Sequence, residues 1–145
     1  MKEHAAARSE ALARLCDAFG VEVVYAFGSR AGDALAWMSG ERRDLSPGGS
    51  DLDVGVKTPP AVKFGVRDKV RLTLALEDLF GVSRVDLVGL NDADPFLAAN
   101  IIRGERLYAR DSYLADEYEL YVLRRAGDLA PLERERMALI LGEAS

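Results

Sequence analysis

The chain has 145 residues, a length that favours one domain with a core large enough to fold without disulfide or metal staples. Its single cysteine, Cys16, and its single histidine, His4, exclude an internal disulfide, a thiolate zinc cluster and a catalytic triad or dyad that depends on histidine. Metal or acid–base chemistry in this chain therefore has to use carboxylates.

The charge balance and hydropathy of the sequence bear on whether nucleic acids or membranes are partners of this protein. Nineteen Lys and Arg residues against twenty-four Asp and Glu residues give a net charge of −5. Proteins that clamp long nucleic acids usually carry a basic surplus, so we do not expect a tRNA or DNA substrate. No apolar run approaches the roughly 20 residues that span a bilayer, and residues 1–14 contain no apolar segment of the signal-peptide type. We expect a cytoplasmic protein with no membrane partner.

Segments with apolar residues at helical spacing alternate with short runs of β-branched and aromatic residues, and Gly or Pro marks most boundaries. In chain order we predict a helix over 3–19, a strand over 21–27, a helix over 30–38, an exposed loop over 39–50, a strand over 51–57, a helix over 62–80, a strand over 82–90, a helix from Asp92 or Asp94 to Ile102, a short strand over 105–109, and helices over 111–125 and 131–142. This order predicts an α/β (α+β) domain in which helices flank a small mixed sheet.

Two features of this pattern matter below. The helix over 62–80 carries an apolar set at helical spacing, which we expect to face the core: Val66, Val70, Leu74, Leu76 and Leu79. We also expect one unit over residues 1–110 and a helical C-terminal extension over 111–145 that packs on the same domain.

Asp51 and Asp53 are two residues apart in a predicted strand, so both carboxylates should project from the same face of the sheet. Neighbouring carboxylates repel one another unless a cation lies between them. Such a pair suits Mg²⁺, which takes one or two carboxylates together with waters and substrate phosphates. The alternative is a solvated strand end at which both side chains face water.

Asp86 interrupts the apolar run of the third predicted strand. A buried aspartate needs a partner or a cation, because an unpaired buried charge is costly. If this strand lies beside the strand over 51–57, three carboxylates converge, which is enough to hold two Mg²⁺ ions around a nucleoside triphosphate and an acceptor hydroxyl. The alternative is an ion pair between Asp86 and Arg84.

Gly28-Ser29 ends the first predicted strand and leads directly into a helix. Backbone N–H groups at such a junction suit a phosphate, and glycine lets the phosphate approach the backbone closely. Arg30, the next residue, is a candidate for a charged phosphate contact. By itself Gly-Ser is also an ordinary turn.

Together, Gly28-Ser29, Ser50-Asp51-Leu52-Asp53 and Asp86 resemble the Gly-Ser…Asp-x-Asp…Asp signature of the DNA polymerase β nucleotidyltransferase superfamily. The chain is most similar to its smallest members, the minimal nucleotidyltransferases of the antitoxin type that are paired with HEPN toxins. The resemblance covers residues 21–90, and residues 94–110 resemble the stretch that follows the catalytic sheet. It implies a small mixed sheet of the polymerase β type.

The resemblance also implies roles for individual residues. Gly28 and Ser29 would hold the β- and γ-phosphates of ATP, with Arg30 and Ser50 as further nucleotide-binding candidates. Catalysis and metal binding would fall to three aspartates: Asp51, Asp53 and Asp86. Of these, Asp51 and Asp53 would bind both Mg²⁺ ions. Asp86 would bind the catalytic ion and help to deprotonate the acceptor hydroxyl.

The sequence departs from the family pattern between Ser29 and Asp51, where residues 30–50 form a longer connection than the family usually has. The excess falls at about residues 37–47. It either extends a loop beside the active site or narrows the nucleotide pocket.

The leading hypothesis is a Mg²⁺-dependent antitoxin that transfers AMP from ATP to a tyrosine of a partner HEPN toxin. One alternative is an antitoxin without catalytic activity that acts by binding alone. Another is a nucleotidyltransferase for a small molecule of the aminoglycoside kind. The sequence leaves open the preferred base, the acceptor and whether the chain forms a homo-oligomer.

Overall fold

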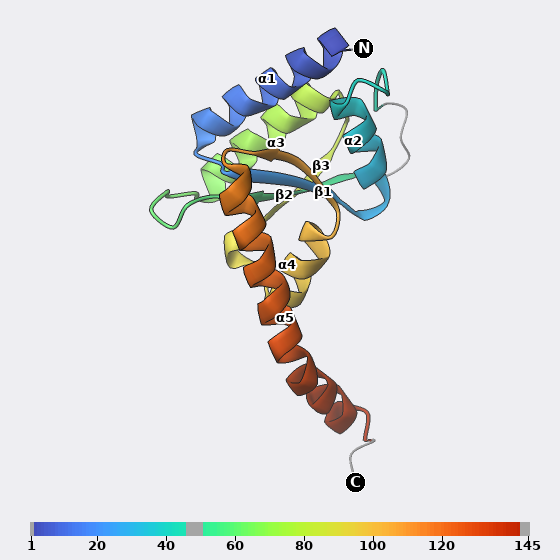
Figure 1. Cartoon of the computed structure of the whole chain (residues 1–145), viewed down its shortest axis with the longest axis vertical. Helices are drawn as coiled ribbons and strands as arrows, with labels where there is room; N and C mark the ends of the chain where they lie inside the picture. The colour runs from blue at the N-terminus through green and yellow to red at the C-terminus, as the bar shows by residue number, and fades with distance from the viewer. Residues whose placement is uncertain (1, 46–50, 143–145) are drawn as a thin grey trace.

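The computed structural model describes residues 2–45 and 51–142. A four-stranded sheet lies in the middle of the molecule, with helices on both faces (Figure 1). The elements are, in chain order, α1 (Lys2–Phe19), β1 (Val23–Phe27), the 3₁₀ turn η1 (Gly28–Arg30), α2 (Ala31–Met38), β2 (Leu52–Lys57), α3 (Val66–Phe80), β3 (Val85–Gly89), the 3₁₀ turn η2 (Leu90–Asp92), α4 (Pro95–Ile102), β4 (Glu105–Ala109) and α5 (Ser112–Ile140). The predicted fold class, a mixed sheet flanked by helices, is confirmed.

The sheet has the strand order β3-β2-β1-β4. Strand β1 is antiparallel to both β2 and β4, whereas β2 and β3 are parallel. The register pairs Phe27 at the end of β1 with Asp53 of β2, and it pairs Asp53 with Asp86 of β3. The end of β1 and the beginnings of β2 and β3 therefore meet at one end of the sheet.

The two faces of the sheet carry separate cores. Helices α1, α2 and α3 cover one face, where Leu12, Val54 and Leu76 are among the buried residues. Helices α4 and α5 cover the other face, where Tyr25 and Ile101 are fully buried. Because side chains alternate along a strand, β2 directs its valines into the first core and leaves Asp53 on the second face.

The apolar face of α3 differs from the predicted one. Leu72, Leu76 and Phe80 face the core, whereas three members of the predicted set are exposed on the outside of the helix: Val66, Val70 and Leu74. The helix also begins at Val66 rather than at residue 62. Its N-terminus is capped by Asp68, whose carboxylate accepts a hydrogen bond from the Gly65 N–H at 3.1 Å. Apolar residues on both sides of this helix made its buried side ambiguous from spacing alone.

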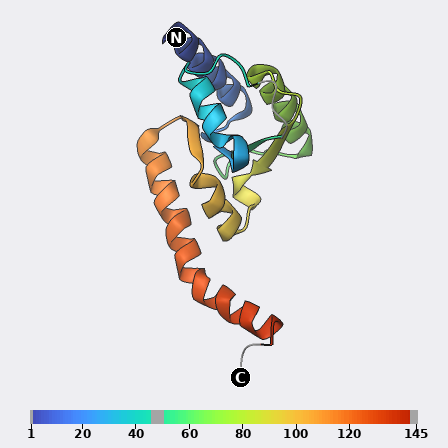
Figure 2. The ribbon, with the colours of Figure 1, turned by 90° about the vertical axis from the view of Figure 1, so that its right-hand side faces the viewer.

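The prediction of two C-terminal helices is wrong, because α5 runs without interruption from Ser112 to Ile140 with Pro131 inside it. A proline removes one backbone hydrogen bond and its ring crowds the carbonyl of residue i−4, here Gly127, so it bends a helix when the flanking turns persist. Figure 2 shows the helix bending away from the body in its second half.

Within the described residues, no helix is both long enough and apolar enough to cross a membrane.

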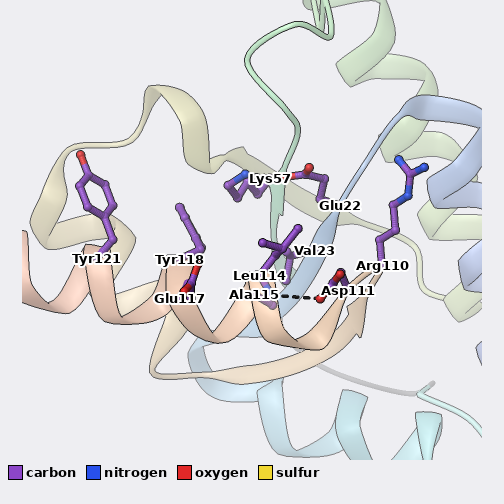
Figure 3. Close-up of a pocket in the computed structure, with 10 residues that line it drawn as sticks. All are labelled: Glu22, Val23, Lys57, Arg110, Asp111, Leu114, Ala115, Glu117, Tyr118 and Tyr121. Atoms are coloured by element: carbon purple, nitrogen blue, oxygen red, sulfur yellow. Dashed lines mark hydrogen bonds and ion pairs between the residues drawn. The ribbon is translucent and has the colours of Figure 1, made fainter.

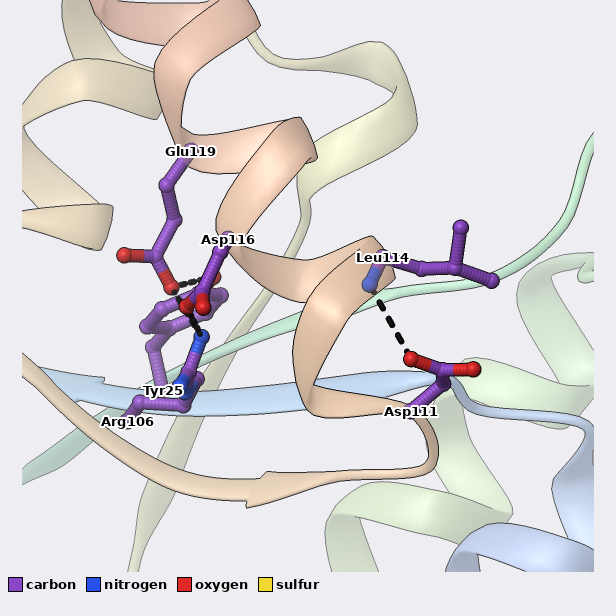
Figure 4. Close-up of polar contacts among 6 residues, drawn as sticks. All are labelled: Tyr25, Arg106, Asp111, Leu114, Asp116 and Glu119. Carbon is purple, nitrogen blue, oxygen red and sulfur yellow. Dashed lines mark hydrogen bonds and ion pairs between the residues drawn. The ribbon is translucent and has the colours of Figure 1, made fainter.

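A polar clasp fastens the first half of α5 to the sheet (Figure 4). The hydroxyl of the fully buried Tyr25 donates to Glu119 at 2.7 Å. Arg106 of β4 donates to Glu119 at 3.0 Å and to Asp116 at 2.9 Å. The Asp111 side chain caps the helix by accepting from the Leu114 N–H at 3.1 Å. The clasp joins β1, β4 and α5 through charge-assisted hydrogen bonds in a partly buried position.

Replacing Tyr25 by Phe removes one of these bonds from a buried position. We expect Tyr25→Phe to lower the free energy of unfolding by about 1–2 kcal/mol, measured by urea denaturation. Tyr108→Phe is the matched control, because its hydroxyl makes no hydrogen bond within the described residues. That variant should cost less than about 0.5 kcal/mol. Equal losses in the two variants would contradict the clasp.

Candidate active site

Three carboxylates gather at the beginnings of β2 and β3. Asp53 lies directly across from Asp86 in the parallel pair, and Asp51 precedes Asp53 by two residues. Asp53 is half-buried and Asp86 is exposed. The sequence predicted these three residues as a group, and the sheet register explains how two neighbouring strands bring them to the same region.

The electrostatics of this region favour a cation. Burial raises the pKa of Asp53, and the negative charges of Asp86 and then Asp51 raise it further. Burial by itself opposes a charge of either sign, but the negative charges of Asp86 and Asp51, which also raise this pKa, attract a cation. Within the described residues, Arg84 is the only basic side chain that pairs with one of these three carboxylates. Its Nε lies 3.3 Å from Asp51 Oδ2.

The alternative role considered for Asp86, an ion pair with Arg84, is wrong. Arg84 pairs with Asp51 and not with Asp86, which forms no ion pair in the described part of the chain. The pair is also largely exposed, at 74% for the Arg84 side chain and 47% for that of Asp51. Exposed pairs of this kind contribute little to stability, so a divalent cation would displace Arg84 at low cost.

The donor set fits a hard divalent cation. Carboxylate oxygens are the ligands that Mg²⁺ prefers, and the mutual repulsion at Asp53 is relieved when such an ion binds. No group of three His, Cys, Asp or Glu side chains in the described residues is close enough to form a ready-made metal cage. The aspartates thus supply part of a ligand shell, which suits an ion that keeps several waters and substrate phosphates.

Gly28 makes room for Asp53. Its φ of +75° lies in the left-handed region, and a Cβ at this position would lie 2.5 Å from Asp53 Oδ2. Only glycine combines that backbone conformation with so close an approach to a carboxylate. The turn η1 then carries Ser29 past the end of β1, so the predicted phosphate-binding pair directly adjoins the carboxylates.

Gly104 is a residue that the sequence analysis missed. A Cβ there would lie 2.3 Å from the backbone oxygen of Ala26 and 3.0 Å from the Cα of Phe27. The end of α4 therefore approaches the backbone of β1 next to Gly28, which a side chain at position 104 would prevent. A glycine between a predicted helix and a predicted strand was the available signal.

Arg30 is directed toward the inserted segment. Its side chain is buried, donates a hydrogen bond to the backbone oxygen of Leu45 and has its Nε 3.9 Å from Asp33 Oδ2. Its proposed contact with nucleotide phosphates stays a prediction. Ser50, the fourth nucleotide-binding candidate, lies outside the described residues.

The described part of the insertion is built into the fold. Trp37, Met38 and Leu45 are buried, so the prediction of an exposed loop is wrong for Leu45. Trp37 packs edge-on against Phe80, with ring centroids 5.1 Å apart.

Arg8 of α1 fixes this segment in place. Its guanidinium lies 4.4 Å above the Trp37 ring and donates to the backbone oxygens of Trp37, Arg42 and Arg43 at 2.6–2.8 Å. These contacts tie α1 to the end of α2 and to the segment over residues 39–45 that follows it.

A groove of about 660 Å³ lies at the opposite end of the β1–β2 pair (Figure 3). Val23, Lys57 and Tyr118 line it, and Lys57 Nζ lies 5.1 Å from the Tyr118 ring centroid. The register places Val23 opposite Lys57, four residues along each strand from the pair of Phe27 and Asp53. The groove is therefore separate from the carboxylates.

The sequence from residue 10 to residue 113 matches the family model described as polymerase beta, nucleotidyltransferase. The chain belongs to the polymerase beta nucleotidyltransferase family. This confirms the family that the motif predicts and, with it, the enzyme class. No curated protein matches the sequence.

Several solved structures are similar to this family member. A toxin–antitoxin structure with AMP-PNP has a TM-score of 0.61 at 21% identity, over 91% of this chain and 94% of the other. A tri-AMPylated Shewanella oneidensis HEPN toxin in complex with MNT antitoxin gives 0.61 at 17% identity, over 94% and 95%. A minimal nucleotidyltransferase is 37% identical over 69% of this chain and 88% of the other, with a TM-score of 0.48. The first two matches show a shared fold.

Gly28→Ala tests the close approach to Asp53. The left-handed conformation costs an alanine about 1–2 kcal/mol, and the new methyl group displaces the flexible Asp53 carboxylate. We expect a lower free energy of unfolding by this amount and a weaker stabilisation by Mg²⁺ in thermal denaturation. Gly32→Ala is the control, because nothing lies within 4 Å of its added Cβ in α2. It should raise stability by up to about 1 kcal/mol; stabilisation by both changes would contradict this geometry.

Asp53→Asn tests the repulsion among the carboxylates. With EDTA present, removing this half-buried charge should raise the melting temperature by about 2 °C. With Mg²⁺ present, the wild-type protein should gain stability and the variant should gain much less. Asp92→Asn, an exposed change on η2, should alter neither melting temperature nor the response to Mg²⁺. A lower melting temperature for Asp53→Asn in EDTA would show that the carboxylate serves the fold instead.

Proposed function

We propose that this chain is a cytoplasmic, Mg²⁺-dependent antitoxin that transfers AMP from ATP to a tyrosine of a partner HEPN toxin. The observation that carries the proposal is the sheet register, which sets Asp53 beside Asp86 and beside the end of β1 where Gly28 leaves space for a carboxylate. We assign the catalytic unit to residues 1–110 and treat residues 111–145 as its helical extension.

Each of these residues has a role in the proposed reaction. Gly28 and Ser29 bind the β- and γ-phosphates of ATP, and Arg30 and Ser50 support the nucleotide side of the site. Asp51, Asp53 and Asp86 hold Mg²⁺, with two ions expected. When bound, Mg²⁺ neutralises charge on the phosphates and on the departing pyrophosphate.

The proton and bond changes follow from the position of Asp86. Its carboxylate accepts the proton of the tyrosine hydroxyl, and the tyrosine oxygen attacks the α-phosphorus of ATP. A new oxygen–phosphorus bond forms as the bond from the α-phosphorus to the bridging oxygen breaks, and pyrophosphate leaves with the electron pair. Asp51 and Asp53, at the start of the neighbouring strand, would hold the cations that keep the triphosphate in line for this attack.

The solved relatives support the choice of partner and nucleotide. One is a toxin–antitoxin with AMP-PNP, and another is a tri-AMPylated HEPN toxin with its bound MNT antitoxin. The match to the second extends over 94% of this chain and 95% of that antitoxin. The shared fold over nearly all of both chains supports a protein acceptor like the HEPN toxin bound by that antitoxin.

A transfer assay tests the proposal. Purified chain, Mg²⁺ and ATP labelled in the adenylyl group should transfer label to the co-encoded HEPN-domain protein. Asp53→Asn and Asp86→Asn should each reduce the rate by at least about a hundredfold, because carboxylates that act as a unit fail together. Asp92→Asn, outside the site, should keep the wild-type rate.

Undiminished transfer by Asp53→Asn would contradict the assignment of the site. Neutralisation of the toxin by wild-type and Asp51→Asn chains alike, with no label transferred, would support the binding-only alternative. Release of pyrophosphate with aminoglycosides and no partner protein would support the small-molecule alternative.

A further inference from the structure

Arg84 lies two residues before Asp86, where the chain enters β3. The backbone N–H of Leu52 donates to the Arg84 oxygen at 3.1 Å, so the parallel pairing of β2 and β3 continues back to this position and sets Arg84 beside Asp51. Residues two apart in a strand share a face of the sheet, so Arg84 shares a face with Asp86. Asp51 shares that face with Asp53 by the same rule. Two neighbouring side-chain pairs, one of opposite charges and one of like charges, therefore lie side by side on this face.

These side chains lie on the face of the sheet that α4 and α5 cover. Val88, two residues beyond Asp86 on β3, packs against the core of that face. The cover is incomplete at the carboxylate end, because Asp51, Arg84 and Asp86 are all exposed. The guanidinium of Arg84 therefore lies at an open margin of the site, on the same face as the groups that the proposed reaction uses.

Little holds the Arg84 side chain in its present position. Within the described residues its one side-chain partner is Asp51, at 3.3 Å, and the side chain is 74% exposed. An exposed pair of this kind contributes little to stability. Two residues of a strand advance the chain by about 6.6 Å, a distance that the long side chain of arginine spans. Arg84 can therefore leave Asp51 and reach the space beside the Asp86 carboxylate.

The proposed reaction calls for a further cation in this space. Two Mg²⁺ ions carry less positive charge than three carboxylates and a triphosphate carry negative charge, and donors aimed at the phosphate oxygens stabilise the transition state. Arg30, the candidate that the sequence predicted, is buried and donates to the backbone oxygen of Leu45. Lys57, on the same face of β2, lies four residues from Asp53 and pairs with Glu22 at 2.5 Å. Both of these cations are committed to other partners.

The strand order decides which phosphate Arg84 meets. In the order β3-β2-β1-β4, Gly28 and Ser29 follow β1 on one side of β2, and Arg84 precedes β3 on the other side. The proposed function assigns the β- and γ-phosphates to the β1 side and the acceptor hydroxyl to Asp86 on β3. The α-phosphate lies between these two groups in an in-line transfer. Arg84 is therefore on the side of the α-phosphate and the acceptor.

We propose that Arg84 donates hydrogen bonds to the nonbridging oxygens of the α-phosphate once its partner Asp51 binds Mg²⁺. In the metal-free chain the guanidinium neutralises Asp51, and on metal binding it turns to the nucleotide. The planar fork of a guanidinium matches two phosphate oxygens, which the ammonium group of a lysine does not. This inference rests on the proposed function, because the nucleotide is the substrate that the proposed reaction brings to this site.

Arg84→Gln tests the proposal through two affinities that should change in opposite directions. Without nucleotide, Mg²⁺ no longer competes with the guanidinium for Asp51, so the Mg²⁺ concentration for half-maximal thermal stabilisation should fall about twofold to fivefold. At saturating Mg²⁺, the affinity for AMP-PNP, measured by calorimetry, should weaken at least about fivefold, because a charge-assisted hydrogen bond is lost. A residue that only supports the fold would not shift the two measurements in opposite directions.

Arg14→Gln is the matched control. Arg14 is also an exposed arginine in an ion pair, with Glu10 at 3.6 Å, and its side chain is 71% exposed. It lies on α1, which covers the opposite face of the sheet. This variant should keep the wild-type response to Mg²⁺ and the wild-type affinity for AMP-PNP. In EDTA, both variants should melt within about 2 °C of the wild-type chain.

The transfer assay separates a contact with the nucleotide from a contact with the acceptor. Arg84→Gln should lower kcat at least about tenfold and leave the KM for the acceptor protein at its wild-type value, since the contact strengthens in the transition state. Arg84→Lys keeps the charge without the fork. It should recover part of the AMP-PNP affinity, while Mg²⁺ again competes with a cation for Asp51.

Wild-type values of both affinities in Arg84→Gln would overturn the proposal, and so would a weaker response of that variant to Mg²⁺. A raised KM for the acceptor protein with unchanged AMP-PNP affinity would overturn it as well, because Arg84 would then contact the acceptor. A wild-type chain that transfers no label, with both affinity shifts present in Arg84→Gln, would refute the proposed function alone, since neither affinity depends on catalysis.

Discussion

The parallel pairing of β2 with β3 sets Asp53 beside Asp86, and the rest of the site depends on this one arrangement. Two carboxylates on adjacent strands repel one another, and burial of Asp53 makes its charged form costlier still. This repulsion lies at one end of the sheet, and the negative charge of Asp51 increases it. A divalent cation bound here would reverse the balance, because the carboxylates that repel one another would all attract the ion.

The remaining elements hold this end of the sheet in place. Gly28 and Gly104 remove the side chains that would obstruct Asp53 and the end of β1. The helices α1, α2 and α3 close one face of the sheet, while the clasp of Tyr25, Arg106 and Glu119 fastens α5 to the other. The second half of α5 bends away and lies outside this framework (Figure 2). Helices packed on both faces of the sheet therefore hold β1, β2 and β3, and with them the carboxylates, in place.

Features set by neighbouring residues could be predicted from the sequence, and features set by distant contacts could not. Alternation along a strand placed Asp51 and Asp53 on one face, but their proximity to Asp86 required the register of β2 and β3. Spacing identified α3 as a helix, yet it assigned Val70 to the core because the helix is apolar on two sides. Pro131 suggested a helix end, although intact turns on both sides carry the helix through it as a bend.

The central claim is that the three aspartates make this chain an AMP-transferring enzyme. Intact-mass spectrometry of the HEPN-domain protein, co-expressed with wild-type chain or with Asp51→Asn, tests it most directly. The account predicts a partner that gains one or more adenylyl groups beside the wild-type chain and none beside Asp51→Asn. A partner of unmodified mass that the wild-type chain still neutralises would contradict it, as would equal modification by both chains.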